Sequence, residues 1–341
     1  MPPETPSERR PRLTPAIADV RRAVRESLEA FPSSDDALVL VALSGGPDSL
    51  ALAAAAAFEA PRRGMRAGAV IVDHGLQRES ATVAAKAAEQ ARGLGLEPVL
   101  VRLVEVDAGP GSGGPEAAAR AARYTALDAV RRETSSVAVL LGHTLDDQAE
   151  TVLLGLARGA GASSLHGMAP VSGAFVRPLL GIRRSSTLAA CADAGLEPWL
   201  DPHNVDTAFS RVRVRQSVLP TLERELGPGM AEALARTADQ LREDGDALDH
   251  MAEETIEEIV EHAEAGIAIS IGALTANPAA LRNRIIRHVV SSEFGVSLSR
   301  AQTLAAAALV TEWHGQKGVD LPGIRVVRVA GKLVFQAASD I

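Results

Sequence analysis

The chemical groups that stand out most lie in one short loop between an apolar run and an alanine-rich stretch, Ser44-Gly45-Gly46-Pro47-Asp48-Ser49. Glycine lets backbone N–H groups approach an anion closely, and a helix that follows the loop adds the partial positive charge of its N-terminus. The serines supply hydroxyl donors, so the loop is suited to phosphate. Asp48 would repel phosphate unless a cation lies between them, which predicts a nucleotide accompanied by Mg²⁺.

The loop differs from the two commonest nucleotide-binding motifs. It has no lysine for a Walker A motif and no G-x-G-x-x-G pattern for a Rossmann fold. It resembles instead the PP-loop of the N-type ATP pyrophosphatases, which cleave ATP between the α- and β-phosphates and adenylate a substrate. A plain glycine turn before an ordinary helix is the simpler alternative. We disfavour it because every position of the motif matches in the required strand-to-helix context.

A second group of polar residues follows the apolar run at 137–141 and comprises Gly142, His143, Asp146, Asp147 and Glu150. Helical spacing places Asp147 and Glu150 on one face, with His143 just before the helix. Acidic residues in a first helical turn also favour the helix dipole without any chemical role. We expect capping for Asp146 and catalysis for Asp147, because Asp147 is crowded with His143 at a strand end.

Two arginines, Arg120 and Arg123, stand three residues apart in an alanine-rich helix expected over 116–132. One surface arginine is usually solvated and would mean little. A pair on a helix that borders the same crevice is suited to a polyphosphate or to the charge of a transition state.

Strands that alternate with helices are needed to position these groups. Apolar runs predict strands at 38–43, 69–72, 98–104 and 137–141, and helices are expected over 15–31, 50–59, 79–94, 116–132 and 146–158. Such alternation is typical of an α/β fold with a doubly wound parallel sheet. Ligands of these sheets lie at the carboxyl ends of strands. The loop at 44–49, Asp73 with His74, and Gly142 with His143 all lie at such ends.

The remaining pattern predicts a second, smaller domain. Residues 1–14 are expected to be a flexible tail, and 15–225 a catalytic domain whose last part, 178–225, is a connector. Beyond residue 226 the pattern is helical over 229–264, 278–294 and 298–312, and a hairpin is expected from 319–329 and 332–335. We therefore expect a mainly helical domain over 226–341.

Composition excludes several classes of protein. The 341 residues are 46% hydrophobic, enough for two cores, and no uncharged apolar run is long enough for a membrane span. The single cysteine, Cys191, excludes an internal disulfide framework and a cysteine-based cluster, and a cytoplasmic location is expected. A net charge of −8 argues against a uniformly basic nucleic-acid binder. The run Arg211-Val-Arg213-Val-Arg215 is nevertheless locally basic and could grip phosphates.

Together these segments resemble the tRNA(Ile)-lysidine synthase family over about residues 38–225, and the remainder only in general layout. The matching motifs are the loop at Ser44, Asp73-His74-Gly75, Arg120-x-x-Arg123-Tyr124, His143 to Thr151, Arg177-Pro178-Leu179-Leu180 and Arg211-x-Arg213-x-Arg215. One departure is Val212, where the family usually has asparagine, so the tRNA contact expected of that asparagine is in doubt.

The resemblance implies a ligase reaction on RNA. ATP would adenylate C2 of the wobble cytidine in a tRNA(Ile) with a CAU anticodon, and free L-lysine would then give lysidine, AMP and pyrophosphate. The product would decode AUA instead of AUG. The implied ligands are ATP with Mg²⁺, lysine and tRNA(Ile); the sequence leaves a homodimer open.

The resemblance also distributes roles among the residues. It implies catalysis by Asp147, Arg120 and Arg123, and ATP binding by residues 44–49, Asp73, His74, Gly142 and His143, with Mg²⁺ on Asp48. Asp146 and Glu150 are lysine-binding candidates, and Arg177, Arg211, Arg213 and Arg215 are tRNA-binding candidates.

Three competing functions are less compatible with the chain. A tRNA thiolase of this class needs a cysteine pair or a cluster, and an amidotransferase-linked ligase needs a glutaminase domain for which little length remains. A nucleotide sensor without turnover would not need the groups at 143–150 or the arginine pair.

Overall fold

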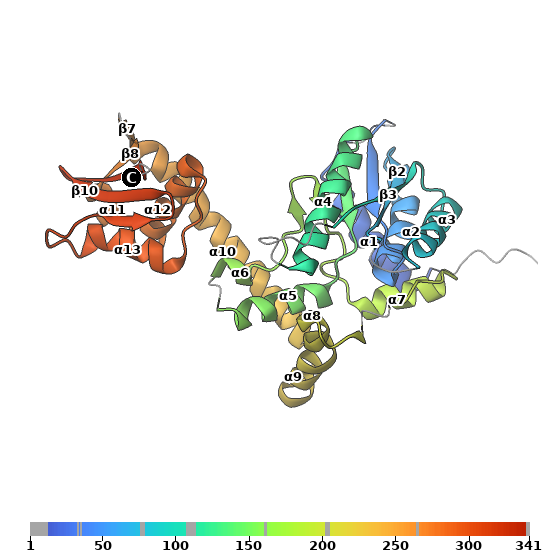
Figure 1. Ribbon diagram of the computed structural model, residues 1–341. Coiled ribbons are helices and arrows are strands. Elements are labelled where there is room, and N and C mark those ends of the chain that lie inside the picture. The colour runs from blue at the N-terminus through green and yellow to red at the C-terminus, as the bar shows by residue number, and fades with distance from the viewer. Residues whose placement is uncertain are drawn as a thin grey trace, which may run out of the picture. The chain divides into compact units, whose positions relative to one another are not determined.

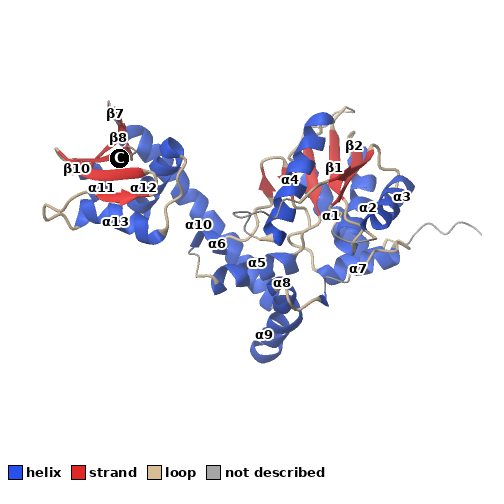
Figure 2. Cartoon of the chain, in the orientation of Figure 1, coloured by secondary structure: helices blue, strands red, loops and turns tan. Residues whose placement is uncertain are grey.

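The computed structural model describes residues 13–32, 34, 36–75, 79–106, 114–159, 162–201, 205–263 and 266–338 (Figures 1 and 2). The described residues form two compact units, one from the chain up to 159 and from 165 to 238, the other from 162–164 and from 239 onward. Except for Leu13 and Thr14, the predicted tail lies outside the described residues.

The first unit contains a six-stranded sheet, and its four predicted strands are confirmed. The strands are β1 (Leu38–Ala42), β2 (Arg66–Asp73), β3 (Val99–Leu103), β4 (Ala138–Leu141), β5 (Val171–Ser172) and β6 (Phe175–Val176). Their order is β3-β2-β1-β4-β6-β5, and only the β5–β6 pairing is antiparallel. Strands β5 and β6 were not predicted, because strands of two residues are too short to show a period.

Helices cover both faces of this sheet, as the doubly wound prediction requires (Figure 1). These helices are α1 (Pro15–Leu28), α2 (Pro47–Arg62), α3 (Ser80–Gly93), α4 (Pro115–Glu133) and α7 (Arg184–Asp193), whereas α5 (Leu145–Ala157) follows β4 and packs in a separate cluster. Alternate residues of β1 enter different cores. Val39 and Val41 pack with α1, α2, α3 and α7, whereas Leu38 and Leu40 pack with Leu127 of α4. A parallel strand that is buried on both faces has this composition.

The connector after the sheet forms helices that pack on α5. These are α8 (Ser210–Arg213), a π-helix, η2 (Val214–Val218), α9 (Leu219–Leu226) and the first turns of α10 (Met230–Ile259). A separate apolar cluster joins Leu145 and Ala149 of α5 to Val214, Leu219 and Ala231. The arginine run at 211–215 is thereby brought beside the polar face of α5.

The second unit is built on a five-stranded antiparallel sheet. Its elements after α10 are β7 (Val260–Ala263), β8 (Gly266–Ser270), α11 (Ile271–Ala276), α12 (Ala279–Phe294), α13 (Arg300–Thr311), β9 (Val319–Leu321), β10 (Ile324–Val329) and β11 (Lys332–Ala337); α6 (Ala162–Leu165) lies earlier in the chain. The strand order is β7-β8-β11-β10-β9.

Two expectations for this unit require correction. The helix expected to run to 264 ends at Ile259, because Val260 pairs with Ile269 of β8. The expected hairpin is confirmed as β10 and β11, which belong to the larger sheet. The division between units falls after residue 238, inside α10, rather than near 226. The closeness of β8 to β11 explains Gly266: a Cβ there would lie 2.0 Å from the carbonyl oxygen of Phe335. Among the described helices, none combines the length and apolar character that a membrane span requires.

Candidate functional site

The loop at 44–49 forms a compact turn at the start of α2. The Ser44 N–H donates to Ser49 Oγ at 3.2 Å, and the Ser49 hydroxyl donates to the Gly46 carbonyl at 3.0 Å. Gly45 has a φ of +82°, a conformation that disfavours side chains, and Gly46 caps α2 without a side-chain hydrogen bond. First-turn N–H groups of α2 without a side-chain cap are suited to an anionic ligand, as the sequence predicts.

The end of β4 lies directly against this loop. A Cβ on Gly142 would lie 2.9 Å from Ser49 N and 3.1 Å from the carbonyl carbon of Asp48, so glycine alone permits the contact. The predicted meeting of strand ends is thus confirmed for 44–49 and Gly142. At the end of β2, Asp73 Oδ1 accepts the N–H of Gly75 at 2.9 Å.

Both histidines expected at the strand ends have a buried ring nitrogen with an unsatisfied hydrogen-bonding position among the described residues. Within the described part of the chain, Nδ1 of His74 and Nδ1 of His143 have no hydrogen-bond partner. The pKa of His143 is lowered to about 3, chiefly by burial, with Arg123, Arg177 and Arg120 acting in the same direction and Asp147 opposing them. His143 is therefore neutral near pH 7. Burial likewise lowers the pKa of His74.

The start of α5 gives Asp147 two roles. Thr144 is the N-cap: its hydroxyl oxygen accepts the Asp147 N–H at 3.5 Å, and Asp147 Oδ2 accepts the Thr144 N–H at 2.8 Å, which together form a capping box. The Thr144 hydroxyl also donates to Asp147 Oδ2 at 2.9 Å. The expectation that Asp146 caps this helix is wrong. Asp146 Oδ2 instead accepts the N–H of Arg184 at 2.7 Å, at the start of α7. The Oδ1 atom of Asp147 remains directed at the charged cluster described next.

Arg184 links the loop at 44–49 to α5, and sequence reasoning missed it. Its Nη2 lies 2.5 Å from Asp147 Oδ1, its Nη1 3.3 Å from Glu150 Oε1, and its Nε 3.3 Å from Asp48 Oδ2. Asp48 also accepts the Thr187 hydroxyl. Arg184 is the first residue of α7 and follows Arg183, and no sequence motif at this position distinguishes it from a solvated arginine.

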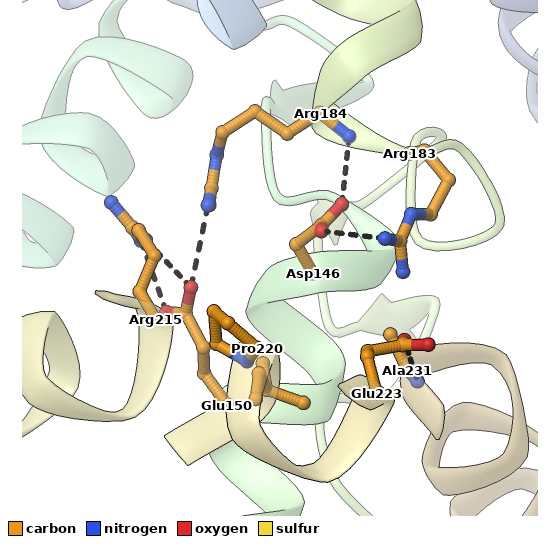
Figure 3. Close-up of a pocket in the computed structure, with 9 residues that line it drawn as sticks. Asp146, Glu150, Arg183, Arg184, Arg215, Pro220, Glu223 and Ala231 are labelled. Carbon is orange, nitrogen blue, oxygen red and sulfur yellow. Dashed lines mark hydrogen bonds and ion pairs between the residues drawn. The ribbon is translucent and has the colours of Figure 1, made fainter. Parts of the chain in front are cut away.

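Arg215 completes the cluster from the connector. Its Nε lies 2.7 Å from Glu150 Oε1 and its Nη2 3.0 Å from Glu150 Oε2 (Figure 3). Its Nη2 also lies 3.4 Å from Asp147 Oδ1. Burial would raise the pKa of Asp147, but Arg184, the Thr144 backbone N–H and His143 outweigh it and hold that pKa below its usual value. Burial raises the pKa of Asp48, although Thr187 and Arg184 oppose it.

A cavity of about 130 Å³ opens beside these ion pairs (Figure 3). Its lining residues are Asp146, Glu150, Arg183, Arg184, Arg215, Leu219, Pro220, Glu223 and Ala231. The Glu223 carboxylate accepts the backbone N–H of Gly229 at 2.7 Å and of Ala231 at 3.3 Å, which fixes one wall. Both lysine-binding candidates, Asp146 and Glu150, thus face one small polar cavity.

The other predicted arginines occupy different environments. Arg120 Nη2 and Arg177 Nη2 approach the hydroxyl of Tyr124 at 3.3 and 3.4 Å, and the Arg123 guanidinium lies 5.8 Å from the centre of that ring. Arg177 is only 7% exposed and also donates to the Ala169 carbonyl at 2.7 Å. The structure therefore gathers Arg120, Arg123 and Arg177 around one tyrosine.

The three arginines of the run at 211–215 also have different partners. Arg211 Nη2 donates to Thr151 Oγ1 at 3.3 Å, and Arg215 is held by Glu150. Arg213 is exposed, and its Nη1 donates to the carbonyls of Thr207 and Ala208 at 2.7 Å each. Arg211 and Arg215, four residues apart, share the helix side that meets α5, whereas Arg213, two residues from each, lies on the opposite side.

A divalent cation would find one carboxylate ligand at the loop. Among the described residues, no cluster of three or more His, Cys, Asp or Glu side chains could hold a metal alone. Mg²⁺ is commonly bound by one or two carboxylates together with substrate phosphates. Asp48 fits that chemistry, with the nucleotide supplying the remaining oxygens.

Comparisons with known proteins match two domain families and a set of similar chains. The PP-loop domain family matches residues 19–222, and the TilS substrate binding domain matches residues 269–334. The tRNA(Ile)-lysidine synthase of Leifsonia xyli is 65% identical over 89% of this chain and 91% of its own length.

The chain belongs to the tRNA(Ile)-lysidine synthase family. The synthase of Thermobifida fusca is 50% identical over 91% of this chain and 94% of its own length. Members of the family are ligases with a PP-loop domain. The U34-tRNA thiolase NcsA from Methanococcus maripaludis, solved with its 4Fe-4S cluster, is 20% identical with a TM-score of 0.55 over 67% of this chain and 80% of its own, a likeness of fold alone.

Proposed function

We propose that this chain converts the wobble cytidine of a tRNA(Ile) with a CAU anticodon to lysidine. The cytosine C2 oxygen attacks the α-phosphorus of ATP, the bond from that phosphorus to the α–β bridging oxygen breaks, and pyrophosphate leaves. The amine of free L-lysine then attacks C2, the bond from C2 to its oxygen breaks, and AMP leaves. The modified anticodon would read AUA instead of AUG.

One observation carries this proposal. Arg184 touches both Asp48 in the nucleotide loop and the carboxylates of α5, so a phosphate site and an ammonium site adjoin. An enzyme that activates one substrate with ATP and then joins an amine to it needs these two sites side by side. The cavity beside Glu150 and Asp146 supplies room for the amino acid.

The adenylation step would use the loop at 44–49 and the arginines that lie around Tyr124. Backbone N–H groups and hydroxyls at 44–49 would hold the triphosphate, with Asp73, His74 and neutral His143 near the nucleotide. Arg120 and Arg123 would stabilise charge on the transferring phosphorus. Mg²⁺ held on Asp48 would neutralise part of the phosphate charge.

The second step explains why a carboxylate is needed at Asp147. A lysine amine has a pKa of about 10.4, so its deprotonation at pH 7 costs roughly 4.6 kcal/mol. An ionised Asp147 is too weak a base to remove that proton in advance. It can hold the ammonium and accept the proton while the C–N bond forms. Asp146 and Glu150 would contribute to lysine binding through their charge.

For the RNA, the target base lies in a single-stranded loop and can be turned into a pocket without breaking a duplex. The match of residues 269–334 to a substrate binding domain supports a contact with tRNA by the second unit. In the first unit, exposed Arg213 and partly exposed Arg211 are the better phosphate contacts, since Arg177 is buried and Arg215 is paired with Glu150.

The test is a reaction of the purified chain with ATP labelled on the α-phosphate, lysine and tRNA(Ile). We expect AMP release that requires both lysine and tRNA, and a digest in which the wobble cytidine has gained the mass of lysine less that of one water, because the C2 oxygen leaves with AMP. An elongator tRNA(Met) with the same anticodon is the matched control. Release of ADP, or nucleotide binding without turnover, would overturn the proposal.

A further inference from the structure

Arg184 binds carboxylate oxygens in both halves of the proposed site, the nucleotide loop and the ammonium site on α5, which the substrates would need. Its guanidinium contacts carboxylates of three residues: Asp48 on one side, and Asp147 and Glu150 on the other. Its side chain is only 19% exposed, so these contacts are partly shielded from water. Such contacts are stronger than those on an open surface.

An incoming ammonium would find the α5 carboxylates already neutralised. Asp147 Oδ2 accepts two hydrogen bonds from Thr144, and its Oδ1 faces both Arg184 and Arg215. Both oxygens of Glu150 are engaged by Arg215. One cation must therefore move before a lysine amine can bind here.

Of the two arginines, Arg184 is the one whose release is easier. Arg215 grips Glu150 through both oxygens at 2.7 and 3.0 Å, a two-pronged arrangement that favours retention. The contacts of Arg184 are spread over three carboxylates, and only the one to Asp147 is short. Its Nε already lies beside Asp48, within the loop that would receive the triphosphate.

A polyphosphate at that loop supplies a competing partner for Arg184. The planar guanidinium matches phosphate geometry, and a triphosphate carries more negative charge than one carboxylate. A rotation of the long side chain can complete the exchange without any displacement of α7. The exchange would leave Asp147 and Glu150 with one cation fewer.

We propose that Arg184 is a positioning residue that makes lysine binding depend on ATP. In the free chain its guanidinium fills the ammonium site, and bound triphosphate draws it away. This inference rests on the proposed function. Because coupling between two sites is reciprocal, lysine must strengthen nucleotide binding by the same factor.

Calorimetric titration of the full chain tests this coupling. Lysine is titrated with and without an ATP analogue whose α–β bridging oxygen is replaced by methylene, which prevents cleavage. In the unmodified chain we expect the analogue to tighten lysine binding by at least about tenfold, and lysine to tighten analogue binding equally. In Arg184→Gln we expect lysine to bind without the analogue more tightly than in the unmodified chain, with coupling below about threefold.

Two further variants separate positioning from folding. Arg184→Lys keeps the positive charge but loses the planar guanidinium, so it should retain part of the coupling. It replaces the glutamine variant in the test if that variant does not fold. Arg102→Gln removes an arginine that is paired with Glu133 through both carboxylate oxygens at 2.7 and 2.8 Å outside the site, and it should leave the coupling unchanged.

The outcomes also separate this inference from the proposed function. Undiminished coupling in Arg184→Gln, or weaker lysine binding both with and without the analogue in a folded variant, would overturn the inference while the synthase assignment stands. If the unmodified chain binds no lysine even with the analogue and tRNA(Ile) present, the proposed function itself fails.

Discussion

At the scale of single residues, several polar side chains of the site serve the fold and the chemistry together. Asp147 closes the capping box of α5 with one oxygen and meets Arg184 with the other. Asp146 holds the first N–H of α7, and Glu223 holds the start of α10. Substitutions at these positions therefore change stability and turnover together, and each experiment must separate the two.

Asp147→Asn should abolish lysidine formation but retain ATP binding. The amide cannot accept a proton from the lysine amine, and general acid–base groups contribute about 10²–10⁴-fold, so we expect a loss of at least about a hundredfold. AMP release and nucleoside mass spectrometry measure the turnover, and fluorescence titration measures nucleotide affinity. Thr144→Ala removes the capping hydroxyl but keeps the Asp147 carboxylate, and it should lower the free energy of unfolding by roughly 1 kcal/mol. Its turnover shows how much of the loss in Asp147→Asn comes from a weakened helix cap. Turnover near the normal rate in Asp147→Asn would exclude the assigned role.

His143→Asn should make the chain less sensitive to acid. The pKa of His143 is about 3 in the folded chain and 6.5 ordinarily, so the unfolded chain binds the proton first as the pH falls. The free energy of unfolding is unaffected by this group above pH 6.5 and falls below it, by up to about 1.4 kcal/mol per pH unit. Urea unfolding at about pH 7 and about pH 5 should show a smaller difference for His143→Asn. Because the pKa of His74 is also lowered, His74→Asn with His143→Asn should reduce the slope further. Equal slopes in all three chains would refute the prediction.

At the scale of elements, sequence reasoning located nearly all of the first unit because its parallel strands are apolar on both faces, as Leu38 to Val41 illustrate. It also predicted that the strand ends meet, because the carboxyl ends of parallel strands lie at the same edge of a sheet. It missed β7 and β8, since the helical period of α10 runs into Val260 without a proline or glycine to end it. It missed Arg184, since contacts across 136 residues of chain leave no local pattern.

Gly142→Ala tests the approach of β4 to the loop. The added methyl would meet backbone atoms of Ser49 at 2.9 and 3.0 Å, which cannot rotate away. Overpacking of this kind typically costs about 1–3 kcal/mol, so we expect that loss in the free energy of unfolding together with weaker ATP binding. Gly93→Ala, where a Cβ would have no neighbour within 4 Å, is the matched control and should preserve nucleotide affinity. Unaltered nucleotide affinity in Gly142→Ala would show that the loop does not need this contact.

At the scale of the whole molecule, the net charge determines which parts of the chain can bind RNA. With 43 acidic and 35 basic residues, the chain is repelled by RNA on average, so binding must depend on local basic elements. Three arginines of the first unit, Arg183, Arg184 and Arg215, are already paired with carboxylates beside the proposed site. Phosphate contacts near the site must therefore come from other arginines, and loss of one such contact should have a measurable effect.

Arg213→Gln should weaken tRNA binding and reduce its dependence on salt. Arg213 is exposed beside the site, and its guanidinium holds only backbone carbonyls, so it can also contact a phosphate. Loss of one phosphate contact should reduce the slope of log K against log salt by about 0.7–0.9. The slope is measured by filter binding of tRNA(Ile) at several salt concentrations, with Arg22→Gln, an exposed arginine of α1 paired with Asp19, as a charge-matched variant. If Arg213→Gln lowers affinity without changing the slope, its role is to hold the carbonyls of Thr207 and Ala208 and thereby shape the connector. If the two variants change the slope equally, the effect comes from net charge and not from a contact at the connector.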